Sequence, residues 1–500
     1  MRWATMGPSA GWCSTPRRRS AFALLAVVLA ALAASIFHPP PTAGPFARDF
    51  EAYYAAGVTW NAGGDPWSRD VWAVERTIPG VDASRDELLP FVGPAASLPL
   101  WSVLARFPFD VARIVWIALL VLALAALALA AATLAHARLT ASRAASALLF
   151  AALTGPVISD IALGQAALVS AAGVALALIA LEARSRWAIA AAFVAAIQPN
   201  LALPLAVRLT GRRAVVFLGG AAAAFIALTF LTGGGPAGLV AYVHRLAQHG
   251  ASERFILIQY SAPAIIASFR VAPAIAAFTG NAFAVLAVAA AITGALRLRA
   301  QPRLAAAIAI AVLPWAVPFF HEHDFVIELI PVMILAASPN ARVRMLAGVA
   351  APCVLVDWLG VTQRPDAAAQ TVCLAFAVAC AFAALPNQSL RAASPLPPLL
   401  ACVVLTLIAI PMALAFPATV WPDALGAFHA AANLDASAVW AAEQQRAGLD
   451  ATVPAWGIVR AIPLLGCALL AVAAYVAGGA ATMTTRPART ASGTAVSDSP

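Results

Sequence analysis

Asp49 is the carboxylate whose position in this sequence is best suited to chemistry. It lies in the stretch Arg48-Asp49-Phe50-Glu51-Ala52-Tyr53-Tyr54, which follows the first apolar run and opens a polar segment. A lone carboxylate at such a boundary can act as a general base that takes the proton of a hydroxyl nucleophile. A solvated ion pair with Arg48 is the structural alternative. Glu51 is the nearest competing base, but in a helix its side chain points in a different direction from that of Asp49.

The segment His321-Glu322-His323-Asp324 is a second group of polar residues, at the junction of two predicted spans. Its spacing differs from the HExxH pattern of zinc-dependent hydrolases. A structural metal, an interfacial cluster and a plain turn are all open interpretations, as is contact of one His or Asp324 with a substrate phosphate or hydroxyl. Glu328 enters the next apolar run, where a carboxylate is a functional candidate.

Arg245 belongs to a predicted outside loop that also contains Tyr242, His244, His249 and Arg254. Fixed cations of this kind suit a phosphate dianion. An ordinary basic patch beside a membrane is the alternative.

Two further polar sites read as turns. Asp65 lies in the segment Asn-Ala-Gly-Gly-Asp-Pro-Trp at 61–67, whose composition predicts a turn that starts a new element. Gln165 follows Asp160 and Gly164 in a polar turn between two apolar runs. Plain turns account for both sites from local sequence alone.

The composition places these residues in a membrane protein. The chain has 500 residues, of which 62% are hydrophobic and 11% charged, and its mean hydropathy is +0.86. Soluble proteins carry roughly 25% charged residues. The net charge of +9 comes from Arg in short loops between apolar runs, which is a topogenic pattern and does not indicate nucleic acid binding. The six cysteines show no metal-ligand spacing.

The apolar runs predict an all-α, polytopic integral membrane protein with about 12 transmembrane helices. The predicted spans cover approximately residues 20–37, 109–134, 144–161, 166–183, 213–231, 272–296, 304–320, 325–338, 343–359, 368–385, 398–416 and 457–479. The first run could be a signal peptide, but the many spans after it favour an uncleaved helix. The run 187–207 is broken at Gln198-Pro199-Asn200 and flanked by Arg at both ends. It predicts a broken or re-entrant pair of half-helices, with a full span as the alternative.

The distribution of charge sets the expected topology. Residues 1–19 form a cytoplasmic N-terminus, 20–479 the transmembrane domain and 480–500 a disordered cytoplasmic tail. Within the domain, 38–108 is the large first extracytoplasmic loop and 417–456 a late one. Arg is denser on the cytoplasmic side, as the positive-inside rule requires, and the acidic residues gather on the opposite face. The protein is therefore expected in the plasma (inner) membrane, with its polar chemistry facing outward.

The succession of motifs resembles glycosyltransferase family 87, the polyprenyl-phosphate-mannose-dependent mannosyltransferases of the GT-C superfamily. The likeness extends over approximately residues 45–330. The motifs that carry it are Asp49-Phe50 with Tyr53-Tyr54-Ala55-Ala56-Gly57, Gly64-Asp65-Pro66-Trp67, Phe91-Val92-Gly93-Pro94 with Pro99, Gly164-Gln165, the Gln198-Pro199 break followed by Arg212-Arg213, and the turn His321–Asp324.

The resemblance implies a GT-C-type fold and a hexosyltransferase. The donor would be a polyprenyl-phosphate sugar, most often mannose, and the acceptor a glycolipid or glycan at the membrane lipids. No cofactor beyond the lipid-linked donor is implied, and a divalent metal is left open. Asp49 would be the general base of an inverting transfer. Substrate or donor contacts fall on Tyr53, Asp65, Gln165, Gln198, Arg245, His321, His323 and Asp324.

The chain departs from the family at two points. Gln198 stands where the family usually has Lys before the Pro, and Val-Gly-Pro follows Phe91 where a Tyr-Pro step is usual. The lost Lys removes a charge that would suit a donor phosphate. This departure keeps open a non-catalytic envelope assembly protein of the same fold. A transporter or lipid flippase is the other alternative, since such proteins also use about 12 spans, often in two similar halves.

Overall fold

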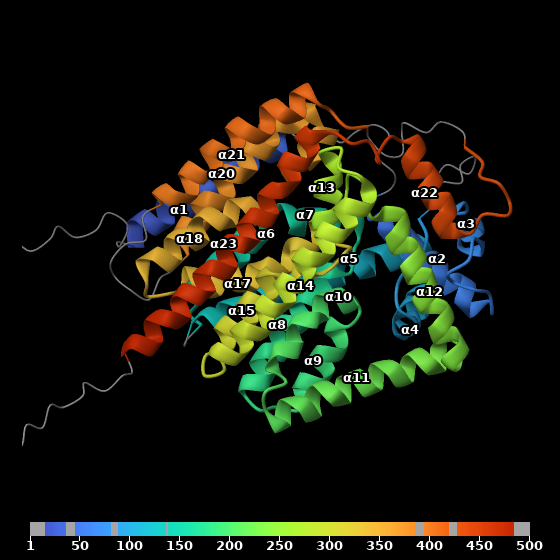
Figure 1. The fold of residues 1–500 in the computed structure, drawn as a ribbon, viewed down its shortest axis with the longest axis horizontal. Coiled ribbons are helices and arrows are strands. Elements are labelled where there is room, and N and C mark those ends of the chain that lie inside the picture. The colour runs from blue at the N-terminus through green and yellow to red at the C-terminus, as the bar shows by residue number, and fades with distance from the viewer. Residues whose placement is uncertain are drawn as a thin grey trace, which may run out of the picture.

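The computed structural model describes residues 16–36, 46–81, 89–136, 139–385, 395–419 and 428–484, and every regular element among them is a helix (Figure 1). This confirms the all-α prediction. Most of the predicted N-terminal segment 1–19, most of the tail 480–500 and parts of both extracytoplasmic segments lie outside the described residues.

Seven of the described helices are long and apolar enough to cross a membrane. These are α1 (Pro16–Ile36), α5 (Phe109–Ala135), α11 (Arg212–Thr232), α14 (Pro273–Arg297), α20 (Ala368–Ala384), α21 (Leu396–Ala415) and α23 (Pro454–Thr484). They define a polytopic membrane protein, as predicted, although the number of about twelve is not confirmed. The last helix continues past residue 479, where the sequence predicts the start of the tail.

One predicted span is two helices. The run 144–161 forms α6 (Ala141–Ala152) and α7 (Gly155–Leu163), which are bent by 66° and would make an eighth span if counted together. Gly155 and Pro156 explain the break. Pro156 lacks the N–H that a continuous helix would use. The N–H of Gly155 donates to the Leu355 carbonyl at 2.8 Å, outside the helix.

The remaining described helices are shorter, and several fill the interior. They are α8 (Ala167–Glu182), α9 (Trp187–Ala195), α10 (Pro199–Ala202), η2 (Leu203–Arg208), α13 (Ala262–Ser268), α15 (Pro302–Ala311), α16 (Leu313–Ala316), α17 (Leu329–Ala336), α18 (Ala341–Val354), α19 (Gly360–Gln363) and η4 (Pro365–Ala367). The predicted break at Gln198 is confirmed, because the helix stops before it and a new one starts at Pro199. Small residues allow close packing: a Cβ on Gly173 of α8 would press on the α9 backbone.

Polar elements gather at one end of the molecule, on the right of Figure 1. They comprise α2 (Asp49–Asn61), α3 (Asp70–Glu75), α12 (Gly235–Glu253) and α22 (Ala436–Arg446). The short apolar helix α4 (Leu98–Leu104) packs on α2 and follows η1 (Ala95–Ser97), whereas η3 (Glu322–Glu328) contacts α7 and α8. The segment around Tyr242 and Arg245, predicted as a loop, is the 19-residue helix α12. Its start follows Gly234, which has a φ of +83°, a conformation that glycine adopts readily.

Candidate active site

Asp49 is the first residue of α2, and the docking of this helix start fixes its position. Phe50 is fully buried and stacks on Trp116 of α5, with ring centroids 6.0 Å apart. The Trp116 indole N–H donates to the Gly164 carbonyl at 2.7 Å. Gly164 has a φ of +75° and packs so closely on Ala47 and Phe50 that a side chain there would clash. The turn after α7 is therefore pressed against the start of α2.

This contact brings Gln165 to Asp49. The Gln165 amide donates from Nε2 to Asp49 Oδ2 at 2.5 Å, and its Oε1 accepts from the Tyr53 hydroxyl at 2.6 Å. The Tyr53 ring stacks on Trp101 of α4 at 4.6 Å, nearly parallel. Three of the predicted site residues thus form one hydrogen-bonded group, in which Tyr53 orients Gln165 and Gln165 orients the carboxylate.

The surroundings of Asp49 suit a base. Burial raises the pKa of Asp49 above its ordinary value of 3.8, while the hydrogen bond from Gln165 and the charge of Arg48 oppose that rise. A carboxylate with a raised pKa takes a proton more readily near neutral pH. The charges of His321 and Glu253 also act on Asp49, so a second polar group lies within electrostatic range.

That second group is centred on Glu253, at the end of α12. Its carboxylate is 3% exposed and accepts from the Trp440 indole at 2.5 Å and from Gln259 at 2.9 Å. His249 and His321 place their Nε2 atoms 3.4 and 3.3 Å from it. Burial alone would raise the pKa of Glu253, but the two histidines and the Trp440 hydrogen bond lower it to about 2. Glu253 is therefore a buried, ionised carboxylate.

His321 is held as a cation by this carboxylate. Its Nδ1 lies 3.2 Å from the Ile258 carbonyl, and its Nε2 lies 3.3 Å from both Glu253 Oε2 and the Gln259 amide nitrogen, so each ring nitrogen has one oxygen acceptor beside it. An imidazolium donates from both nitrogens, whereas a neutral ring donates from only one. Burial works against the charge, yet the hydrogen bond and charge of Glu253 raise the pKa of His321 to about 8.

The rest of the predicted segment plays a supporting part in the structure. Asp324 accepts from the His321 backbone N–H at 2.9 Å, which closes the start of η3. Burial raises the pKa of Asp324 to about 6. His323 is buried, its ring stacks on His321 at 5.4 Å, and burial lowers its pKa well below the ordinary value. Among the described residues, no three His, Cys, Asp or Glu side chains are grouped as metal ligands.

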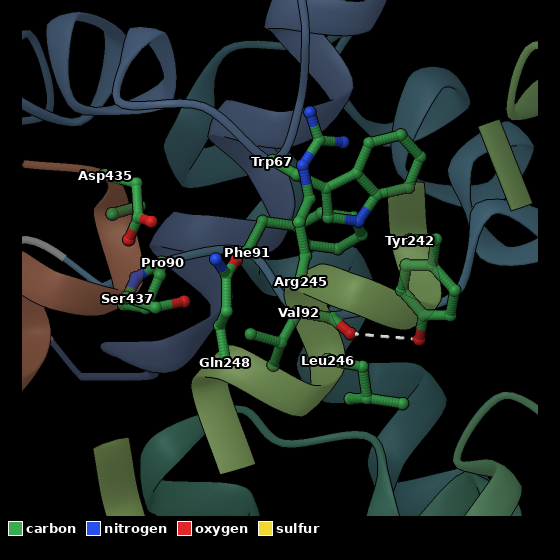
Figure 2. Close-up of a pocket in the computed structure, with 11 residues that line it drawn as sticks. Trp67, Pro90, Phe91, Val92, Tyr242, Arg245, Leu246, Gln248, Asp435 and Ser437 are labelled. Carbon is green, nitrogen blue, oxygen red and sulfur yellow. Dashed lines mark hydrogen bonds between the residues drawn. The ribbon is translucent and has the colours of Figure 1, made fainter. Parts of the chain in front are cut away.

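Asp65 and Arg245 meet elsewhere, across 180 residues of sequence. Arg245 donates to Asp65 Oδ2 at 2.5 Å, and its guanidinium lies 5.5 Å from the Trp67 ring centroid. Arg245 and Trp67 line an open pocket of about 230 Å³ at the polar end, shown in Figure 2, whereas Asp65 is not one of its lining residues. The structure therefore pairs Arg245 with a carboxylate.

Gln198 lies apart from these groups. Its backbone carbonyl accepts from the Ser170 hydroxyl at 3.4 Å, and its Oε1 is buried without a hydrogen-bond partner among the described residues. No contact with Asp49 or His321 is present in the part of the chain that the structure describes.

Glu253 is the residue that sequence reasoning missed. The available signal was its position four residues after His249, which places both on one face of a helix. Because the sequence predicts a loop in this segment, the helical spacing of His249 and Glu253 does not stand out there.

The fold and the site define a many-helix membrane protein with a partly buried carboxylate and a buried His–Glu pair at its polar end. The model of Glycosyltransferase family 87 matches residues 91–318 of this chain, which confirms the resemblance seen in the motifs. The match implies a membrane glycosyltransferase. It includes Gln165, Gln198 and Arg245, and it lies between Asp49 and His321 in the sequence. No curated protein and no solved structure matches the chain significantly.

Proposed function

We propose that this protein is an inverting hexosyltransferase of the GT-C type, with about twelve membrane helices and Asp49 as its general base. It transfers a sugar, most often mannose in this family, from a polyprenyl-phosphate donor to a glycolipid or glycan acceptor. The reaction takes place at the extracytoplasmic face of the plasma membrane, where the first large loop carries the base.

The observation that carries the proposal is the geometry of Asp49. One carboxylate oxygen is held by Gln165, which is itself held by Tyr53. A base fixed in this way can stay aligned with an incoming hydroxyl, and such alignment lowers the entropic part of the barrier. In the proposed step the acceptor oxygen attacks the anomeric carbon, its proton passes to Asp49, and the bond from that carbon to the phosphate oxygen breaks.

His321 supplies the complementary charge. Its imidazolium is oriented by Glu253 and acts electrostatically on Asp49. A fixed cation near the reacting centre stabilises the phosphate that leaves with the polyprenyl chain. In this proposal His321 takes the charge role that the Lys at position 198 would have in the family, since Gln198 is neutral.

Sugar transfer in membranes containing the full chain tests the proposal. Labelled polyprenyl-phosphate-mannose is supplied with a lipid extract as acceptor, to wild type, Asp49→Asn and Glu51→Gln. Glu51 is the matched control, because it lies two residues away on the same helix and burial raises its pKa to about 8. It is therefore already uncharged at neutral pH, and its amide is a close mimic.

We expect wild type and Glu51→Gln to transfer the sugar, and Asp49→Asn at equal protein level to lose at least about 100-fold in rate. Full activity of Asp49→Asn would refute the base assignment. Loss of transfer in both variants would refute the assignment of the base to Asp49 alone. If wild type transferred no polyprenyl-linked sugar, the proposed enzymatic activity would be refuted.

A further inference from the structure

The pocket at the polar end has the lining of a carbohydrate site. It lies between α12, the start of α22 and the loop before η1 (Figure 2). Its lining includes the aromatic rings of Trp67 and Tyr242, whose centroids lie 5.9 Å apart with an angle of 52° between the ring planes.

The polar groups of the pocket suit hydroxyls. Gln248 and Ser437 both donate and accept, Arg245 donates, and Asp435 accepts. Asp435 already caps α22, since its Oδ1 accepts from the Ala438 N–H at 2.8 Å. A pyranose presents C–H groups on its faces and hydroxyls around its rim, so aromatic rings beside such polar groups match both parts of it. Pockets for drug-sized ligands are about 300–1,000 Å³, and this smaller one fits a sugar unit.

The charges of the lining argue against a phosphate. Arg245 is the single cation among the lining residues, and Asp65 pairs with it at 2.5 Å. Asp435 adds another negative charge at the same pocket. A phosphate dianion would have to compete with Asp65 for the guanidinium and would be repelled by Asp435. A neutral sugar meets neither cost, because its hydroxyls can hydrogen-bond to Arg245 and Asp435 without displacing Asp65.

A continuous row of rings connects this pocket with the Asp49 group. Phe91 is 3% exposed and forms part of the pocket wall, 6.0 Å from the Trp67 ring. The Phe91 ring also forms a T-shaped contact with the Tyr53 ring, with the centroids 6.2 Å apart. Tyr53 is the residue that holds Gln165 on Asp49. A ligand in the pocket is thus separated from the base by one aromatic wall.

We infer that this pocket is a subsite for a neutral sugar of the acceptor, on the far side of the Phe91 and Tyr53 rings from Asp49. The assignment of the sugar to the acceptor rests on the proposed function, whereas the binding of a sugar is inferred from the lining of the pocket. It also reassigns Arg245, from a phosphate contact to an acceptor contact.

Binding is tested without turnover. The full chain in lipid nanodiscs is titrated with the methyl glycosides of mannobiose, glucobiose and galactobiose, followed by saturation-transfer NMR. The variants are Trp67→Leu and, as a matched control, Trp187→Leu, whose side chain is 71% exposed on α9 outside the pocket. Asp435→Asn is a second pocket variant, on an exposed residue whose capping role Asn retains.

We expect at least one disaccharide to bind wild type and Trp187→Leu equally, and to bind Trp67→Leu on the order of tenfold more weakly. Asp435→Asn is expected to weaken binding several-fold, which covers the case in which Trp67→Leu does not fold. The inference would be overturned if both pocket variants bound the disaccharide as tightly as wild type. It would also be overturned if inorganic phosphate displaced the disaccharide, or if none of the three disaccharides bound.

Asp49→Asn separates this inference from the proposed function. We expect the variant to bind the disaccharide as wild type does while it loses transfer. Binding by a protein that transfers no sugar would keep the sugar site and refute the enzyme. Transfer that depends on Asp49, with no binding in the pocket, would keep the enzyme and refute the subsite.

Discussion

Replacing Glu253 with Gln should remove the charge of His321 at neutral pH. The substitution keeps the shape of the side chain but takes away the anion 3.3 Å from His321 Nε2. In the native protein burial lowers the pKa of His321, and the hydrogen bond and charge of Glu253 raise it to about 8, against an ordinary value of 6.5. Without Glu253 the burial effect is left with less opposition, so the pKa should fall to 6.5 or below.

The size of this effect follows from the shift. A rise from 6.5 to about 8 corresponds to about 2 kcal/mol of preference for the charged ring. Because the pKa is raised on folding, this stabilisation is fully present below about pH 6.5 and is lost as the pH rises through about 8. The free energy of unfolding of wild type should therefore decline over that window, and the decline should be absent from Glu253→Gln.

The assay is NMR of ring-labelled histidine in nanodiscs, titrated from about pH 5 to about pH 9. A His321→Gln spectrum assigns the resonance. Glu75→Gln is the control, because Glu75 is fully buried in α3 and burial raises its pKa well above the ordinary value. Burial favours the uncharged form of Glu75, so its amide should leave His321 unchanged. A His321 pKa that stays near 8 in Glu253→Gln would refute the electrostatic argument.

Three further predictions concern the residues that hold the site. Tyr53→Phe removes the hydrogen bond to Gln165, worth about 1 kcal/mol, so the transfer rate should fall roughly fivefold at unchanged expression. A wild-type rate would show that Gln165 needs no support. Gly57→Ala places a Cβ against the Trp101 carbonyl and should cost about 1–3 kcal/mol, measured as a lower thermal midpoint in detergent; an unchanged midpoint would contradict the packing. Arg460→Met removes the buried guanidinium that donates to backbone carbonyls in the segment 256–264. It should lower the free energy of unfolding by on the order of 3 kcal/mol, whereas an unchanged stability would show that the segment does not depend on these hydrogen bonds.

Helix content was readable from the sequence because hydropathy acts locally. Runs such as 109–134 and 272–296 became single helices with nearly the predicted bounds, α5 and α14. The errors fall where tertiary contacts decide. The run 144–161 is long enough to span, yet the Leu355 carbonyl captures the Gly155 N–H and the chain bends there. Segment 235–254 lacks the hydropathy of a span, so its helix was invisible to a criterion based on length and apolarity.

The site divides in the same way. The sequence proposes Asp49 because it opens the polar segment after an apolar run, and Gln165 because it stands in a polar turn. Their hydrogen bond joins residues 116 apart, and no local pattern encodes that pairing. Arg245 illustrates the opposite case. Local sequence shows a basic stretch suited to phosphate, but the fold brings Asp65 to it from 180 residues away and neutralises the charge.

Under the proposed function, the buried pair of Glu253 and His321 would let this chain, with Gln198 where the family usually has Lys, still present a cation to the proposed base Asp49. A lysine is charged on its own, and burial would tend to lower its pKa. A histidine in the same surroundings needs a partner to remain charged, and Glu253 is that partner at 3.3 Å. The pair carries no net charge when both members are ionised. The positive charge of His321 therefore acts only over a short range, and its effect depends on how the two side chains are oriented. Transfer that relies on His321 should therefore fail above about pH 8, where the ring loses its proton, while a lysine-based site would continue to work.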